Sequence, residues 1–400
     1  MKKTILAFLI ALALTLTACG NGVTNQPQAV SSTSSVTDPV QQAPSAASEA
    51  VPITSEVSPS NPAQEESAPI MVTNELLPSE GLEFESNGDG TCTLVGIGIC
   101  DDTDLVIPTE SPDGDIVTLI EEYAFMSLED VNSVTLLNYC YKVEDRAFQY
   151  GEMSSVQIIG GAPVIGESAF SSCEDLNTIS FQDSTLQLGE YAFFSCGKDA
   201  AVSFVNCTGT MDKYAFQYND LVSLTIEGCT LEIEDSAFSS CEDLTAIVFK
   251  NSSLEMGEYA FFSAGDAAKV EITDCELFLD DRVFQYASLG TLAIQGGTVE
   301  TGESTFSSCK NLTAVTIDCP IVILGESAFW GCEDLTTVSV CDNGRTDNTI
   351  RIDDGVFQYC EHLSSVTVGN GSIEMGERIF SGCAEGLTVS VDGKAYMTLE

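Results

Sequence analysis

Basic residues are scarce in this 400-residue chain, which contains 14 Lys and Arg against 61 Asp and Glu and has a formal net charge of −47. No Lys or Arg occurs between Lys3 and Lys142. Proteins that bind nucleic acid or anionic lipid need clustered Lys and Arg beside the phosphates, so the composition argues against both partners. An acidic surface instead favours solubility and attracts cations or basic partners.

Histidine is limited to His362, and no C-x-x-C pair occurs in the chain. Nucleophilic catalysis assisted by His therefore has one place at which it could operate. A zinc site needs about four closely spaced ligands. We therefore expect no enzymatic activity, no metal centre and no cofactor.

Long apolar runs are also missing, apart from Ile5 to Leu16, which follows Lys2 and Lys3. This layout is typical of a bacterial secretory signal and is too short for a transmembrane helix. The residues Leu16-Thr17-Ala18-Cys19 resemble the lipobox of bacterial lipoproteins, which implies cleavage before Cys19 and lipidation of that residue. An ordinary signal peptide is the alternative.

Residues 19–75 contain few aromatic residues and many Ser, Thr, Pro and Ala. Such a segment buries too little apolar surface to offset the entropy of ordering, so we predict a disordered linker. Beyond it, 15 of the 16 cysteines remain once Cys19 is set aside. Because this number is odd, at least one thiol stays unpaired in an oxidised monomer. A reducing habitat is the simpler interpretation, with Cys92 and Cys100 as the best candidates for a disulfide.

A repeat dominates the rest of the chain and is marked by a Phe every 22 or 23 residues, with one step of 28. An apolar residue stands five positions before the Phe in all copies but the one with Thr301, and alternating apolar residues follow the Phe. Alternation of period two predicts a half-buried strand. The repeat Phe residues are 125, 148, 170, 193, 216, 238, 261, 284, 306, 329, 357 and 380.

One such repeat cannot bury its own apolar face, but stacked repeats can. We therefore predict a β-rich leucine-rich-repeat solenoid of about 12 repeats, with short parallel strands joined by tight turns or short helical bends. The Phe side chains should form a continuous internal column. A longer period of 68 residues separates Phe125 from Phe193 and Phe261 from Phe329, which indicates copying of a three-repeat block.

The repeat motif has an apolar residue, Gly-Glu, Tyr or Ser, Ala-Phe, two small residues, Cys and then Leu-x-x-Val-x-Ile. It resembles the BspA-type leucine-rich repeat of bacterial surface lipoproteins, and residues 82–108 resemble the cap segment common in that family. The resemblance implies a solenoid at the cell surface that mediates adhesion to host proteins or other cells. Its partners would be surface proteins or glycans of a host or neighbouring cell, with membrane contact only through the lipid.

The expected organisation follows from these features. It comprises a lipoprotein signal peptide (1–18), the lipidated Cys19 with its linker (19–75), an N-terminal β cap (76–120), the repeats (121–391) and a C-terminal end (392–400).

Seven cysteines stand three residues after a repeat Phe, and the thiol is absent from several copies, most of which have a shorter turn. We interpret this optional thiol as a small buried packing group. The residue three before the Phe is acidic in 11 of 12 copies. Capping of backbone N–H groups by these carboxylates is the favoured interpretation, and Ca²⁺ bound at the acidic turns is the alternative.

Two aromatic series accompany the Phe column. Tyr150, Tyr218, Tyr286 and Tyr359 follow it by two residues, and Phe194, Phe262 and Trp330 follow it by one. Interfaces depend on a few Tyr and Trp anchors, so these residues are the candidate ligand-binding set. The competing interpretations are that they fill gaps between turns, and that the whole protein is a passive spacer or coat element or a glycan-binding module.

Overall fold

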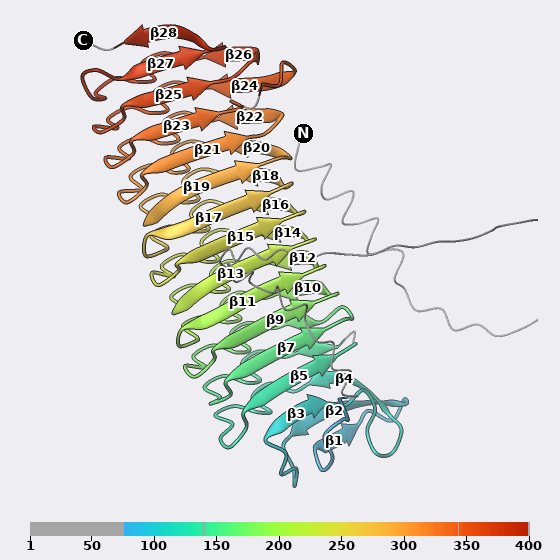
Figure 1. The fold of residues 1–400 in the computed structure, drawn as a ribbon. Helices are drawn as coiled ribbons and strands as arrows, with labels where there is room; N and C mark the ends of the chain where they lie inside the picture. The colour runs from blue at the N-terminus through green and yellow to red at the C-terminus, as the bar shows by residue number, and fades with distance from the viewer. Residues whose placement is uncertain (1–75, 139–140, 343, 399–400) are drawn as a thin grey trace, which may run out of the picture. The chain divides into compact units, whose positions relative to one another are not determined.

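Each turn of the chain contributes one strand to each of two sheets, and the next turn lies against it in register (Figure 1). A computed structural model describes residues 76–400, apart from residues 139–140, 343 and 399–400. The predicted signal peptide, Cys19 and the linker lie outside the described residues. Within these, the chain forms 28 strands and no helix, so tight turns, not short helical bends, join the strands. The described residues accordingly contain no helix able to span a membrane.

The first sheet begins with an antiparallel pair and continues in parallel. Its strands, in spatial order, are β1 (Glu83–Ser86), β2 (Thr91–Gly96), β4 (Ile116–Ile120), β6 (Lys142–Val143), β8 (Val164–Ile165), β10 (Thr185–Leu188), β12 (Thr208–Met211), β14 (Thr230–Ile233), β16 (Ser253–Met256), β18 (Glu276–Leu279), β20 (Thr298–Thr301), β22 (Ile321–Leu324), β24 (Asn348–Ile352) and β26 (Gly371–Met375).

The second sheet is parallel up to β27 and is closed by one antiparallel strand, β28. Its strands are β3 (Asp104–Ile107), β5 (Ser133–Leu137), β7 (Ser155–Ile159), β9 (Thr178–Gln182), β11 (Ala200–Val205), β13 (Leu221–Glu227), β15 (Ala246–Lys250), β17 (Ala268–Thr273), β19 (Leu289–Gln295), β21 (Ala314–Asp318), β23 (Thr337–Val340), β25 (Ser365–Val368), β27 (Thr388–Val391) and β28 (Lys394–Thr398).

The predicted Phe column is confirmed. Consecutive rings from Phe125 to Phe380 stack with centroids 4.8–5.9 Å apart and planes within 18° of parallel. The strands place their alternate apolar residues against this column, and Phe181 stacks on Phe204 while meeting Phe193 edge-on. Thr301, the exception in the apolar position, is buried and accepts the backbone N–H of Gly325 through its hydroxyl.

The repeat cysteines have a defined partner as well as a place in the core. The Sγ–H of Cys173 donates to the carbonyl oxygen of Phe148, and the Sγ–H of Cys241 donates in the same way to Phe216, at 3.2 and 3.1 Å. The described cysteines are free thiols, Cys92 and Cys100 included. Burial raises the pKa of Cys241 to about 12 and that of Cys319 to about 12. These thiols therefore remain protonated donors at neutral pH.

Replacement of Phe216 by Ala should lower the free energy of unfolding by about 3–5 kcal/mol, because it removes a fully buried ring that stacks on two neighbours. Urea denaturation followed by circular dichroism measures the change. A loss below about 1 kcal/mol would contradict a load on the column at this turn.

Folded, reduced protein treated with iodoacetamide at pH 8 should be alkylated at the half-buried Cys100 and not at Cys241 or Cys319. Alkylation needs a thiolate, and thiols with a raised pKa that are closed to solvent supply almost none. Peptide mapping by mass spectrometry distinguishes the sites, and urea should make all of them reactive. Rapid alkylation of Cys241 in folded protein is the contrary result.

Candidate functional site: the aromatic track

The turn that carries the repeat Phe sets the direction of the side chains beside it. The residue two positions after the Phe has a left-handed backbone, with φ between 52° and 80°, in all twelve turns. This position is held by Ser127, Tyr150, Ser172, Ser195, Tyr218, Ser240, Ser263, Tyr286, Ser308, Gly331, Tyr359 and Gly382.

Tyrosine is an unfavourable residue at this position. A left-handed backbone costs a residue with a Cβ roughly 1–2 kcal/mol, and a bulky residue there is an outlier. Burial does not offset the cost, because Tyr150, Tyr218, Tyr286 and Tyr359 are 47–55% exposed. Ser or Gly fills the same position in the other turns, so the requirement for Tyr comes from its exposed ring.

The two predicted aromatic series meet in space. Phe194 contacts Tyr218 edge to face with centroids 5.7 Å apart, and Trp330 contacts Tyr359 in the same way at 5.6 Å. The corresponding pair in the middle block joins Phe262 to Tyr286 at 5.6 Å. We call the set of Tyr150, Phe194, Tyr218, Phe262, Tyr286, Trp330 and Tyr359 the aromatic track.

The proposal that the outer rings fill gaps between turns holds only for part of the set. Phe194 and Phe262 are half-buried, each between two tyrosine rings, whereas Trp330 is 40% exposed and the tyrosines more so. The phenylalanines thus support the tyrosines, and the tyrosines and Trp330 face solvent.

Serine-bearing turns separate the aromatic pairs and fix their period. After each Gln-Tyr turn comes a turn with two serines, and the Gln amide donates to the first of them, as from Gln149 to Ser171 and from Gln285 to Ser307. The second serine, such as Ser308, lies between the aromatic pairs. An aromatic pair therefore recurs every three turns, about 14 Å apart for strands spaced by about 4.8 Å.

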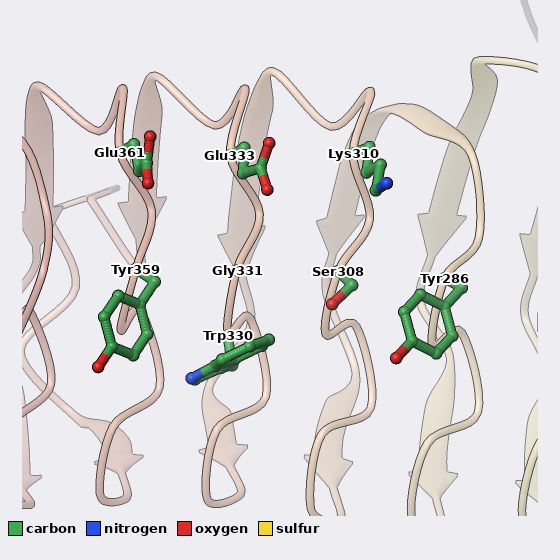
Figure 2. A pocket seen from close by; sticks show the side chains of 8 residues that line it. All are labelled: Tyr286, Ser308, Lys310, Trp330, Gly331, Glu333, Tyr359 and Glu361. Atoms are coloured by element: carbon green, nitrogen blue, oxygen red, sulfur yellow. The ribbon is translucent and has the colours of Figure 1, made fainter.

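A groove of about 270 Å³ lies on the last block of the track. Figure 2 shows Tyr286, Trp330 and Tyr359 in one row along successive turns, with Lys310, Glu333 and Glu361 in a second row parallel to it. Ser308 and Gly331 complete the lining. The three charged side chains are exposed, so the groove offers flat rings on one side and hydrogen-bonding groups on the other.

The acidic turns are held by backbone and Arg contacts. Asp235 Oδ1 accepts the backbone N–H of Glu258 in the next turn at 3.1 Å, and a Cβ on the adjacent Gly257 would come within 2.6 Å of that oxygen. Arg282 bridges Glu258 and Glu303 on either side of it. The capping prediction is thus confirmed with a correction: the carboxylate caps the next turn, not its own.

Two further predicted features have no role in the groove. His362 is exposed, with Nδ1 2.8 Å from the carbonyl oxygen of Glu333, and lies on a turn as expected. Among the described residues, no group of three or more His, Cys, Asp or Glu side chains is arranged to hold a metal ion.

Sequence reasoning missed the charged row of the groove. Lys310 stands four residues after its repeat Phe, where the earlier blocks have Glu174 and Glu242, and Glu333 and Glu361 stand at the same offset in the next two turns. The change of charge at this offset between otherwise similar blocks was the available sign.

The family model of the BspA type leucine rich repeat region (6 copies) matches residues 110–218, 209–336 and 339–394, more than half of the chain. Comparison with curated proteins gives no match. A solved leucine-rich repeat protein from Bacteroides ovatus is 19% identical over 78% of this chain and 92% of its own, with a TM-score of 0.27. A leucine rich cell surface protein from Faecalibacterium prausnitzii is 18% identical over 80% and 95%, with a TM-score of 0.27. The pneumococcal vaccine antigen PcpA is 13% identical over 75% and 97%, also with a TM-score of 0.27.

Replacement of Tyr218 by Gly should change the free energy of unfolding by less than about 1 kcal/mol, because relief of the left-handed backbone offsets the lost edge-to-face contact with Phe194. Urea denaturation beside the Phe216→Ala variant measures both on one scale. A loss of about 3 kcal/mol would instead make Tyr218 a core residue.

Proposed function

This chain belongs to the BspA-type leucine-rich repeat family, and we propose that it is a lipid-anchored cell-surface protein that binds macromolecules through its aromatic track. The observation that carries the proposal is the set of exposed tyrosines at left-handed positions where Ser or Gly serves the fold equally well. Exposed aromatic anchors of this kind supply most of the energy of protein recognition sites.

The proposed anchor is Cys19, following the lipobox-like Leu16-Thr17-Ala18. Residues 20–75 would then serve as a tether, and the cap and repeats from residue 76 onward as the binding part. A lipid on Cys19 places the binding part outside the cell, where host or neighbouring-cell surfaces present their proteins and glycans.

Binding without catalysis is the function proposed for the described residues. Trp330 and its neighbours form an open groove whose charged groups lie in a row along the solenoid and do not converge on a single point (Figure 2). The single histidine is exposed on a turn and faces a backbone carbonyl. Such an arrangement suits contact with an extended partner along the stack.

Replacement of Trp330 by Ala should weaken binding at least tenfold, because a central aromatic anchor contributes about 2 kcal/mol or more. The measurement uses the chain from residue 19, with Cys19→Ser to prevent lipidation, against immobilised matrix glycoproteins and mucins. Phe278→Ala is the matched control, since Phe278 on β18 is 38% exposed, close to the 40% of Trp330, and does not belong to the aromatic track.

Saturable binding that Trp330→Ala reduces and Phe278→Ala leaves unchanged supports the proposal. Equal loss in both variants would indicate general stickiness of exposed rings. No binding to any of these surfaces by a folded protein would favour the passive spacer.

A further inference from the structure

We propose that the aromatic track binds a linear, uncharged glycan whose sugar units contact successive aromatic pairs along the stack. This inference rests on the proposed function and names the class of partner. It draws on four properties of the track: the chemistry of the groove, the single-file placement of the rings, the charge of the surroundings and the three-turn period.

The chemistry of the groove matches a sugar ring. A pyranose has flat faces of C–H groups and a rim of hydroxyl groups. Trp330, Tyr286 and Tyr359 offer flat apolar surfaces for the faces, and Lys310, Glu333 and Glu361 lie in a parallel row where they can donate to and accept from the rim (Figure 2). Apolar rings with a few polar groups in fixed positions are what a small-molecule site requires.

The rings stand in single file with Ser172, Ser240 and Ser308 between the pairs. Protein interfaces gather their anchors at the centre of a broad patch, which the surrounding contacts close off from water. A file of separate aromatic pairs supplies no such centre. It does fit a narrow chain that lies along the turns, so the geometry favours a glycan over a folded protein.

The charge of the surroundings selects among glycans. An acidic residue stands three positions before the Phe in nearly every turn, and the whole chain has a net charge of −47. Sulfated or uronic acid polymers would be repelled by this field. Lys310 replaces the Glu174 and Glu242 of the earlier blocks, so the groove at Trp330 has both a cation and carboxylates as hydrogen-bonding groups. The matching ligand is therefore uncharged.

The three-turn period adds avidity. The pairs at Phe194, Phe262 and Trp330 recur about every 14 Å, so a polymer held at one pair lies within reach of the next. Linked contacts can exceed the affinity of a single contact by 10²–10⁴-fold. Short oligosaccharides should therefore bind far more weakly than the polymer from which they come.

The test is affinity gel electrophoresis of the chain from residue 19, with Cys19→Ser, in gels that contain one polysaccharide each. The neutral probes are mixed-linkage β-glucan, galactomannan, yeast mannan and arabinoxylan, and the polyanionic probes are heparin and hyaluronan. We expect retardation by at least one neutral polymer and by neither polyanion, and at least a hundredfold weaker binding of tetrasaccharides from the same polymer by calorimetry.

Two variants test the track itself. Trp330→Ala should reduce the affinity for the retarding polymer at least tenfold, whereas Phe278→Ala should leave it unchanged. Deletion of residues 194–261 removes one three-turn block and joins Phe193 directly to Phe262, which restores the Phe-Phe-Ser sequence of the turn. This deletion should also weaken polymer binding at least tenfold while tetrasaccharide binding stays the same. Should its circular dichroism show unfolding, Phe194→Ser combined with Tyr218→Ser replaces it.

Three results would overturn the inference. The first is retardation by heparin or hyaluronan at least as strong as that by any neutral polymer. The second is retardation by a neutral polymer that Trp330→Ala leaves unchanged. The third is no retardation by any neutral polymer while binding to immobilised proteins persists and depends on Trp330, a result that leaves the proposed function intact. Loss of both protein and polysaccharide binding in folded protein would remove the two together.

Discussion

Stacking of one Phe turn on the next is the interaction on which the other features of this solenoid depend. The backbone N–H of Phe148 donates to Ala169 in the next turn, Phe170 donates to Ala192, and the rings stack above these bonds at 4.8–4.9 Å. Each turn thus fixes the position and the direction of the one beside it. Side chains that share an offset from the Phe consequently fall into rows, and a row becomes a surface property that no single repeat possesses.

The rows that face the core were predictable from the sequence because burial leaves a short-range pattern. Apolar residues alternate after each Phe, and Ile179 and Phe181 are both fully buried on β9. The tight turn was harder to foresee, because a five-residue apolar spacing also fits a bend with helical geometry. The closing strand β28 was not predicted, since the C-terminal segment has no repeat motif from which to infer it.

The aromatic track was predictable only in part. Its members could be read from the sequence, since Tyr and Trp at fixed offsets repeat every 68 residues. Their pairing could not, because contact between Phe194 and Tyr218 depends on the offset of one turn relative to the next. The strain at Tyr286 was also hidden, as tyrosine gives no indication of a left-handed backbone. Only Gly331 and Gly382, which hold the same position in other turns, pointed to it.

Duplication of a three-turn block gives such a fold a direct route to new binding surfaces. A copied block brings the column, the capping carboxylates and an aromatic pair together, so stability and recognition grow in step. Residues outside the column are then free to change, and the last block has done so, with Trp330 in place of Phe and Lys310 in place of Glu. Both changes lie in the groove and leave the stacking of Phe306 on Phe329 intact. The column therefore allows one block to specialise while its neighbours keep the original surface.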